Sequence, residues 1–256
     1  MLAAERHSKI VDIVNRAGVV SVEELSQQLQ VSAMTIRRDL DKLNRMGRLD
    51  RCHGGAVPLS AIRSEENYDQ KMVSNHDAKM NIARICANFI KPGDSVFLDS
   101  GTTTFEIAML IKETQDITII TNDVKIACAL LSSPAKIILC GGIAQNVTGT
   151  VLGQMAEDML RNFRVTTSFI GTSCVDEEFN ITTPTLEKSF LKRAAIEIAN
   201  TAYLAVDASK FYHHALVRIT NMSSFTGVVT DKVFSAGERK TLKSKNIEII
   251  ETHKYF

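Results

Sequence analysis

The chain has 256 residues, of which 30 are Lys or Arg and 29 are Asp or Glu, so its formal net charge is +1. This balance excludes a protein that binds polyanions over its whole surface and a protein with an acidic tail. Hydrophobic residues make up 45% and charged residues 23% of the sequence, which is the composition of a globular protein. Because domains cluster around roughly 100 to 150 residues, we expect two domains.

The cysteines and the hydropathy of the chain point to a reducing, aqueous compartment. The five cysteines are scattered and form no Cys-x-x-Cys pair, so the sequence predicts neither a disulfide framework nor a zinc site. We expect no metal and no other cofactor. Charged residues occur from Glu5 onward, and no apolar run approaches the roughly 18 residues of a membrane helix. We therefore expect a soluble cytoplasmic protein that has no membrane partner.

The first 57 residues are predicted to form a helical domain that ends in a wing. Apolar residues recur at helical spacing, and Ser21 with Glu24 three residues later forms a capping box. Gly54 and Gly55 indicate a tight turn between two short strands. In chain order we expect a helix over 3–17 capped by Gly18, a second helix after Ser21, a third between Ser32 and Gly47, and strands over 48–50 and 56–59.

The third predicted helix carries positive charge on one face. Ile36 and Leu40 mark its buried side, and at about 100° per residue the opposite side includes Arg38. From Ser32 to Gly54 the basic residues outnumber the acidic ones in a chain that is otherwise neutral: Arg37, Arg38, Lys42, Arg45, Arg48 and Arg51 against Asp39, Asp41 and Asp50. Such a helix can enter a DNA major groove, where Arg binds guanine through two hydrogen bonds.

Two alternatives remain open for this helix. Its arginines can be solvated surface charges, with Arg37 paired to Asp41 four residues on. The basic face can also bind an acidic protein instead of a nucleic acid. If it binds double-stranded DNA, we expect contacts from the helix and from the wing, namely from Ser32, Met34, Thr35, Arg37, Arg38, Lys42, Arg45, Arg51 and His53.

The stretch VSAMTIRRDLDKLNRMGRLDRCHGGAV, preceded by ERHSKIVDIVNRAG, closely resembles the winged helix-turn-helix of the DeoR family of bacterial transcriptional regulators. The match covers residues 5–57 and includes the TIRRDL and HGGA signatures of that family. The resemblance implies operator binding by the third helix, with Thr35, Arg37 and Arg38 as the main readers. Met34 lies at a variable position of the motif and is expected to tune operator preference.

The remainder of the chain is predicted to be an α/β domain. Residues 59–76 are polar and aperiodic, which predicts a linker between a domain at 1–58 and one at 77–256. Short apolar strands then alternate with helices, a pattern typical of a doubly wound, mostly parallel sheet covered on both faces. We expect helices over 79–89, 103–111, 124–131, 153–163 and 186–199, strands over 95–98, 117–120, 136–139, 166–170, 202–206, 216–219 and 227–230, and a last helix and strand within 236–251.

Polar or glycine-rich residues follow five of these strands. The first such loop opens a helix at Gly101, and free backbone N–H groups together with threonine hydroxyls can bind a phosphate there. Taken alone, this loop favours a turn glycine followed by threonine helix caps over a phosphate site. Because the carboxyl ends of parallel strands share one crevice, we expect one binding site formed by Asp99, Ser100, Gly101, Thr102, Thr103, Thr104, Asn122, Gly141, Gly142, Gly171, Asp207 and Lys210.

This half also resembles the DeoR family, whose sensor domain is similar to ribose-5-phosphate isomerase. The matching stretches are DSGTT at 99–103, TN at 121–122, GG at 141–142, FIGTSCVD at 169–176 and VDASKF at 206–211. The resemblance implies that Gly101, Thr102 and Thr103 hold the phosphate of a phosphorylated sugar. It also implies that Asp176, Asp207 and Lys210 line the sugar end.

Four further positions bear on this resemblance. Lys79 and Lys192 match lysines of the family pattern, and they either add positive charge to the site or lie exposed on helices. Asp123 stands where many members have serine. Asn180 stands where the family often has glycine, and we expect the turn to keep a left-handed backbone at Asn180 because asparagine tolerates that conformation.

Together these features predict a repressor of a carbohydrate-utilisation operon whose operator binding is modulated by a phosphorylated sugar. A homo-oligomer, either a dimer or a tetramer, is expected because a two-fold symmetric protein reads paired half-sites. The alternative is a sugar-phosphate isomerase with an accessory helical domain. Its acid and base groups would come from Asp176, Glu187, Lys188 and Asp207.

Overall fold

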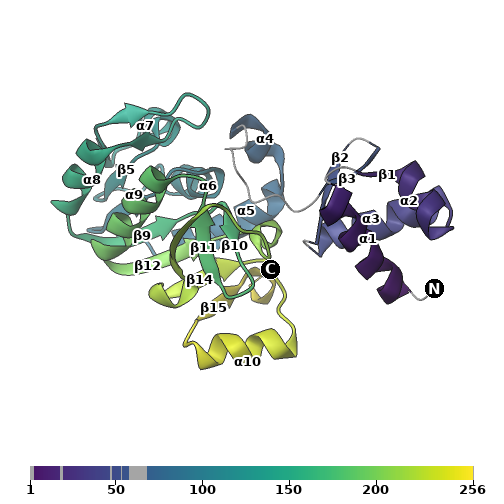
Figure 1. Ribbon diagram of the computed structural model, residues 1–256. Helices are drawn as coiled ribbons and strands as arrows, with labels where there is room; N and C mark the ends of the chain where they lie inside the picture. The colour runs from purple at the N-terminus through teal and green to yellow at the C-terminus, as the bar shows by residue number, and fades with distance from the viewer. Residues whose placement is uncertain (1–2, 18–19, 47, 53, 58–67, 256) are drawn as a thin grey trace.

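The computed structural model describes residues 3–17, 20–46, 48–52, 54–57 and 68–255 of the chain (Figure 1). It contains a small helical domain at the N-terminus and a larger α/β domain built on a twisted sheet. Among the described residues, no helix is long and apolar enough to cross a lipid bilayer. The described part of the chain also contains no group of His, Cys, Asp and Glu side chains that could hold a metal ion.

The small domain has the predicted order of elements. The capping box is present, because Ser21 Oγ accepts a hydrogen bond from Glu24 N at 3.1 Å and Glu24 Oε2 accepts one from Ser21 N at 2.7 Å. Gln30 takes a left-handed conformation and turns the chain between the second and third helices. The elements are α1 Ala3–Ala17, β1 Val20–Ser21, α2 Val22–Leu29, α3 Ala33–Arg45, β2 Asp50–Cys52 and β3 Gly55–Val57.

The wing differs from the prediction in its strands. It has three antiparallel strands in the order β1-β3-β2, because Val20 before α2 pairs with Ala56. Gly55 is required there, since a Cβ at this position would lie 2.1 Å from the carbonyl oxygen of Val20. The two wing strands are shifted by one or two residues from the expected ranges.

Three residues named in the sequence analysis lie outside the described residues. They are the predicted helix caps Gly18 and Gly47 and the candidate DNA contact His53.

The α/β domain contains a seven-stranded parallel sheet, which confirms the predicted fold class. Its strand order is β15-β14-β12-β9-β4-β5-β6, and every pairing is parallel. After β4 the chain first moves outward in one direction through β5 and β6 and then returns to the other side of β4 at β9. The strands are β4 Ser95–Leu98, β5 Thr118–Thr121, β6 Lys136–Leu139, β9 Val165–Ile170, β12 Ala199–Ala205, β14 Gly227–Thr230 and β15 Ile249–Glu251.

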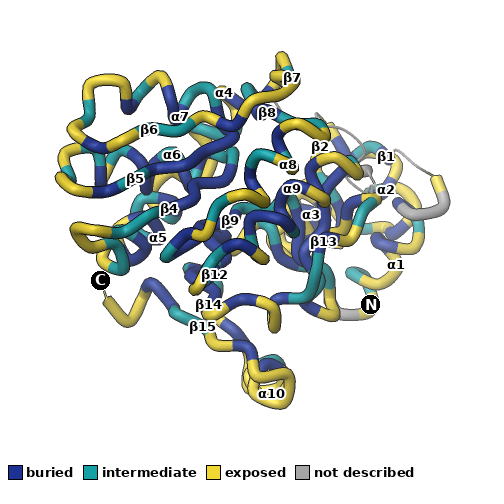
Figure 2. Tube along the Cα trace, turned by 90° about the vertical axis from the view of Figure 1, so that its left-hand side faces the viewer, coloured by how far each residue is buried: buried dark blue, intermediate teal, exposed yellow. Residues whose placement is uncertain are grey.

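Helices cover both faces of this sheet, and two hydrophobic cores result (Figure 2). Because side chains alternate along a strand, Val96 and Leu98 of β4 enter one core and Phe97 enters the other. The first core is covered by α5 His76–Ala87, α6 Thr102–Leu110 and α7 Val124–Ala129. The second is covered by α8 Gln154–Arg161, α9 Leu186–Glu197 and α10 Ala236–Ser244.

One expected strand lies outside the parallel sheet. The predicted strand at 216–219 is found as β13 Val217–Asn221, which pairs antiparallel with β11 Asn180–Thr183. β11 in turn pairs with β10 Cys174–Val175. The burial of β13 fits this position, because this strand is mostly half-buried whereas all four residues of β14 are buried. A separate hairpin of β7 Ile143–Ala144 and β8 Val151–Leu152 was not predicted.

The segment predicted as a linker is partly helical. The structure places α4 Tyr68–Val73 and the first residue of α5 inside the range 59–76. The six residues of α4 bury one side chain, that of Tyr68, so no apolar periodicity marks the helix.

Candidate functional site

The outer face of α3 is exposed as the sequence predicts. Ile36, Leu40 and Leu43 are buried against the rest of the small domain. Met34 is 62% exposed, which leaves its side chain available for contact. Ser32, Arg37, Arg38, Lys42, Arg45 and Arg51 are also exposed, and Thr35 is half-buried. The helix therefore presents a cationic, solvent-exposed face.

Hydrogen bonds fix the two ends of this surface. Ser32 Oγ accepts a hydrogen bond from Thr35 N at 3.2 Å and lies 2.9 Å from Thr35 Oγ1, so both hydroxyls take part in the cap of α3. At the other end, Arg51 of the wing pairs with Asp41. Asp41 is thus joined to the wing by Arg51, and not to Arg37 as the alternative of solvated surface charges had it.

A buried carboxylate attaches α3 to α1. Asp39 is 7% exposed and accepts hydrogen bonds from Arg6 Nη2 at 3.1 Å and from His7 Nε2 at 2.9 Å. Burial alone would raise the pKa of Asp39, but the hydrogen bonds and charges of Arg6 and His7 outweigh it and lower the pKa. The sequence analysis counted Asp39 only in the local balance of charge. Its partners lie more than 30 residues away, so no local pattern could reveal the role.

In the α/β domain, the order of strands reverses between β4 and β9, and three polar groups meet at this point. Asp99 follows β4 and Gly171 follows β9, and Gly171 N donates a hydrogen bond to Asp99 Oδ2 at 3.0 Å. Lys192 on α9 pairs with Asp99 and donates to the carbonyl oxygen of Gly171 at 2.9 Å. Crevices of this kind, at the carboxyl ends of strands where the order reverses, are the usual ligand sites of open α/β sheets.

The loop after β4 leads into the N-terminus of α6. Gly101 is the N-cap of α6 and has an extended backbone that any residue can adopt. A Cβ at this position would meet only the Thr104 hydroxyl at 3.5 Å, so the fold itself does not require glycine here. Glycine at 101 instead leaves room for another group to approach backbone N–H donors at a helix N-terminus, where anions are favoured.

Buried polar groups fix the position of this loop. Asn122 Oδ1 accepts a hydrogen bond from Ser100 N at 3.0 Å. Ser100 Oγ donates to Asp123 Oδ2 at 2.8 Å and lies 2.7 Å from Thr150 Oγ1. Burial raises the pKa of Asp123, although its hydrogen bonds act in the opposite direction. Asp123, where the family often has serine, therefore supports the loop and caps α7.

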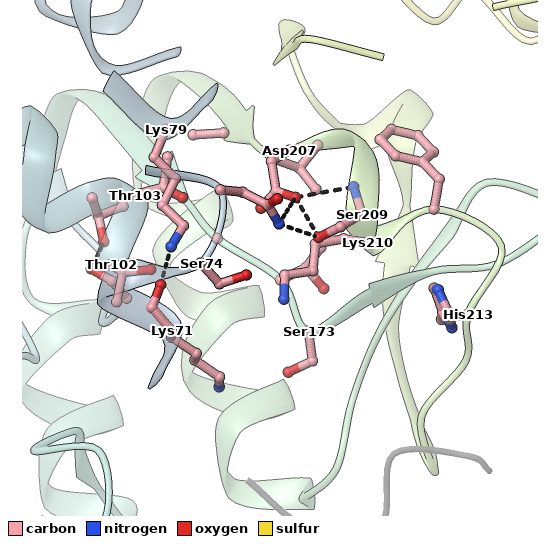
Figure 3. A pocket seen from close by; sticks show the side chains of 18 of the residues that line it. Lys71, Ser74, Lys79, Thr102, Thr103, Ser173, Asp207, Ser209, Lys210 and His213 are labelled. Carbon is pink, nitrogen blue, oxygen red and sulfur yellow. Dashed lines mark hydrogen bonds between the residues drawn. The ribbon is translucent and has the colours of Figure 1, made fainter. Parts of the chain in front are cut away.

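A cavity of about 1040 Å³ opens above these groups, and its charge favours an anion (Figure 3). Figure 3 shows Thr102 and Thr103 on one side and Asp207, Ser209 and Lys210 on the other, with Lys71 and Ser74 between them. The α/β domain lines the cavity with six lysines and two aspartates, namely Lys71, Lys79, Lys188, Lys192, Lys210 and Lys232 against Asp99 and Asp207. Such an excess of lysine attracts anionic ligands.

Lys79 and Lys192, the two helix lysines that match the family pattern, are buried. Lys79 and Lys192 are each at most 6% exposed, so the interpretation of both as exposed helix lysines is wrong. Lys79 Nζ donates a hydrogen bond to the carbonyl oxygen of Lys71 (Figure 3). Lysines are buried at a cost unless they are paired, and both of these have a partner: Lys79 has the carbonyl oxygen of Lys71, and Lys192 has the carboxylate of Asp99.

Three of the predicted site residues lie elsewhere. Gly141 and Gly142 do not line the cavity, and a Cβ at Gly142 would lie 2.6 Å from the carbonyl oxygen of Leu152, so Gly142 serves the packing of β8. Asp176 lies outside it as well and holds the turn before β11, accepting hydrogen bonds from Glu178 N and Asn180 N. The left-handed residue in that turn is Phe179, and Asn180 begins β11, which corrects the expectation for Asn180.

The remaining predicted residues come together around the cavity. It is lined by Asp99, Ser100, Gly101, Thr102, Thr103, Thr104, Asn122, Gly171, Asp207 and Lys210. Arg45 and Arg51 of the small domain also line it. Of the residues named for the isomerase alternative, Lys188 and Asp207 line the cavity, whereas Asp176 and Glu187 do not.

Sequence reasoning missed several lining residues. Tyr68, Lys71, Ser74 and Asn75 belong to the segment interpreted as a linker. Asn75 Nδ2 donates a hydrogen bond to Ser209 Oγ at 3.1 Å, which joins that segment to the loop after β12. Thr148, Thr150, Ser173, Ser209 and Lys232 were also not proposed as site residues. Of these residues, only Ser173 and Ser209 could have been found from the sequence, because they lie in loops that were already recognised as following strands of the sheet.

An exposed cationic helix in one domain and an anion-attracting cavity in another define a ligand-responsive DNA-binding protein. Comparison with known protein families identifies the class of DNA-binding protein to which the chain belongs. The chain matches the DeoR-like helix-turn-helix domain over residues 6–61 and the DeoR C terminal sensor domain over residues 74–232. The chain therefore belongs to the DeoR family of transcriptional regulators, as the sequence resemblance predicts.

Curated relatives match along almost the whole chain. The HTH-type transcriptional regulator GlpR of Haloferax volcanii is 33% identical over 251 residues, which are 98% of each chain. The glycerol-3-phosphate regulon repressor of Escherichia coli is 31% identical and covers 97% of this chain and 99% of its own. The putative aga operon transcriptional repressor of the same species is 30% identical over 96% of this chain and 93% of its own. These relatives are regulators and not enzymes, which favours the regulator over the isomerase alternative.

Solved structures match more weakly and over less of the chain. A D-ribose-5-phosphate isomerase in complex with phospho-erythronic acid has a TM-score of 0.40 and 16% identity over 53% of this chain and 54% of its own. Ribose 5-phosphate isomerase A from Methanocaldococcus jannaschii has a TM-score of 0.41 and 17% identity over 54% of this chain and 55% of its own.

Proposed function

We propose that this protein represses a carbohydrate-utilisation operon and that a phosphorylated sugar or sugar alcohol in the cavity weakens its binding to operator DNA. The proposal is carried chiefly by the excess of lysine around the cavity at the strand-order reversal, in a chain whose other domain exposes a cationic helix. Relatives named as repressors of a glycerol-3-phosphate regulon and of an aga operon support this class of effector.

The proposed roles divide between the domains. The DNA-binding domain at 1–58 contacts the operator through α3 and the wing, with Arg37 and Arg38 nearest to the bases. The sensor domain at 77–256 holds the phosphate at the N-terminus of α6 and the rest of the ligand near Asp207 and Lys210. The protein acts in the cytoplasm as a homo-oligomer, because paired operator half-sites require a two-fold symmetric reader.

The effector must bind the two DNA-binding states unequally to have any effect. A tenfold change in operator affinity corresponds to about 1.4 kcal/mol of coupling between the two sites.

A ligand screen tests the sensor part of this proposal. Thermal unfolding is measured with glycerol 3-phosphate, ribose 5-phosphate, glucose 6-phosphate and fructose 1-phosphate, and with the matching unphosphorylated compounds. We expect a phosphorylated compound to raise the unfolding temperature, because a ligand that binds the native state stabilises it. Lys210→Ala should reduce that increase and should leave the protein on DNA when the ligand is present. Equal shifts with phosphorylated and unphosphorylated compounds would contradict the proposal.

A salt titration tests the DNA part. The duplex used is one that the protein itself selects from a random pool. Because Lys and Arg contacts to phosphate release counterions, the logarithm of the affinity should fall linearly with the logarithm of the salt concentration, by about 0.9 per neutralised phosphate. A flat dependence would favour an acidic protein as the partner of α3.

A further inference from the structure

The first helix after the DNA-binding domain forms a wall of the cavity. Tyr68 of α4 lines the cavity, and so do Lys71, Ser74 and Asn75. In sequence, α4 is separated from β3 of the wing by residues 58–67 only. The polypeptide that leaves the DNA-binding domain therefore enters the sensor domain at the ligand cavity itself.

The side chain of Tyr68 has a feature that packing does not explain. Tyr68 is 6% exposed, and within the described part of the chain its hydroxyl has no hydrogen-bond partner. The ammonium group of Lys125 lies 3.5 Å from the centre of its ring, so the ring is well packed. A buried hydroxyl without a partner costs free energy that a phenylalanine would not. The ring serves the fold, but the hydroxyl does not.

We propose that the Tyr68 hydroxyl donates a hydrogen bond to the anionic ligand in the cavity, and that α4 thereby links occupancy of the cavity to the DNA-binding domain. This inference rests on the proposed function, since it names a further contact of the same ligand and the route by which that ligand acts. Burial and, after it, the charges of Asp123 and Glu106 raise the pKa of Tyr68, so the hydroxyl keeps its proton and acts as a donor.

The other attachments of this segment explain why one more contact matters. Asn75, just beyond α4, donates hydrogen bonds to Asp207 Oδ1 at 3.4 Å and to Ser209 Oγ at 3.1 Å. The carbonyl oxygen of Lys71 accepts a hydrogen bond from Lys79 Nζ. The middle and the C-terminal end of the segment are thus hydrogen-bonded to the sensor domain without ligand. Lys125 of the sensor domain already contacts the end nearest to the DNA-binding domain, through the Tyr68 ring and Asp69, and a ligand that accepts from Tyr68 adds a hydrogen bond at that end.

Tyr68→Phe tests this role, with Tyr255→Phe as the matched control. Tyr255 is 62% exposed near the C-terminus and is not among the cavity-lining residues, so its variant loses the same hydroxyl without touching the cavity. The full-length variants are titrated with inorganic phosphate and with the panel compound that gives the wild type its largest thermal shift. Release from the selected DNA duplex is then followed at increasing concentrations of that compound.

We expect Tyr68→Phe to bind the panel compound about tenfold more weakly than the wild type, because a hydrogen bond to a charged group is lost. The concentration that releases half of the duplex should rise by a similar factor, whereas the affinity for DNA without ligand should not change. The ligand-free unfolding temperature should equal or exceed that of the wild type, because an unsatisfied buried group is removed. A purely structural tyrosine would not produce this combination.

Three outcomes would overturn the inference. In the first, Tyr68→Phe binds the compound and releases DNA like Tyr255→Phe, and the proposed function then survives without the contact. In the second, the variant is less stable without ligand while its ligand affinity is unchanged, which shows a structural role only. In the third, the wild type itself binds neither phosphate nor any panel compound, and the proposed function fails together with the inference.

Discussion

The two domains place their charged side chains in opposite ways. In the DNA-binding domain the arginines of α3 are exposed, and among its described residues the one buried charged side chain, Asp39, holds α3 against α1. In the sensor domain Lys79, Lys188 and Lys192 are buried around a cavity. Both sets of cations are suited to phosphate groups. The arginines of the DNA-binding domain would contact phosphates at its surface, whereas the lysines of the sensor domain would contact a phosphate inside the cavity.

Under the proposed function, the different sizes of DNA and of the effector account for this difference. A duplex is too large to enclose, so its contacts come from side chains that stay hydrated until binding. A small phosphate ester can be enclosed, and lysines that meet it must be desolvated and held by other partners beforehand, as Lys192 is by Asp99. Changes to surface arginines should therefore affect binding alone, whereas changes to buried lysines should affect stability as well. The following variants test that distinction.

The largest effect on stability is expected from Lys192→Ala. Its removal leaves the carboxylate of Asp99, which is 1% exposed, without its cation. Breaking a buried pair in this way should lower the free energy of unfolding by about 3–5 kcal/mol, measured by urea denaturation. Arg161→Ala is the control, because its pair with Glu197 is exposed and should contribute less than about 1 kcal/mol. Equal effects of the two variants would remove the proposed distinction.

Arg38→Ala should act on DNA binding without acting on stability. A bidentate contact between arginine and guanine contributes about 1–3 kcal/mol to discrimination, which predicts a loss of roughly tenfold to a hundredfold in affinity for the selected duplex. Fluorescence anisotropy measures this loss, and the thermal shift with ligand should be unchanged. Lys240→Ala, which removes an exposed cation of α10, should bind the duplex like the wild type. If Arg38→Ala unfolds more easily, the arginine face is part of the fold.

Asp39→Asn should make the stability of the protein less dependent on pH. The pKa of Asp39 is lowered in the folded protein, so its stabilisation is complete above the unfolded pKa of about 4 and is lost as the pH falls through the folded value. The variant should be about 1–3 kcal/mol less stable at pH 7, and the difference should shrink below about pH 4. Urea denaturation from pH 3 to pH 7 measures it. A constant difference would exclude Asp39 as the titrating group.

The smallest effect on stability is expected from Gly101→Ala. The fold leaves space at this Cβ, so the free energy of unfolding should change by less than about 1 kcal/mol while ligand binding weakens. Gly55→Ala in the wing is the contrasting variant, because its Cβ would collide with the carbonyl oxygen of Val20 and should destabilise the protein clearly. If Gly101→Ala binds ligand like the wild type, the loop is a turn and not an anion site.

Features with a local cause could be predicted from the sequence. The capping box at Ser21 and Glu24 depends on residues three apart, and the alternation of strands and helices depends on short apolar runs. The exposed face of α3 follows from helical periodicity in the same way. For these elements the interactions that decide the structure lie within one or two turns of the chain, so the pattern of residues is sufficient.

Features that depend on distant partners could not be predicted. Nothing near Asp39 in the sequence indicates that Arg6 and His7 bury it. Tyr68 stands in a polar segment, and its burial depends on the packing of α4 beside the sheet domain. Asp176 follows a strand end like the true lining residues, but the small antiparallel sheet of β10, β11 and β13 uses it to hold a turn.

The sequence by itself determined the family, the main helices and the parallel strands of the two domains and the polar loops after those strands, because each depends on neighbouring residues. The tertiary structure alone decided which of those loops meet. The reversal of strand order places β4 beside β9 and brings Asp99 within hydrogen-bond distance of Gly171, 72 positions further along the chain. It also decided which lysines are buried. Pairing and burial are set by contacts between distant segments, which local patterns do not encode.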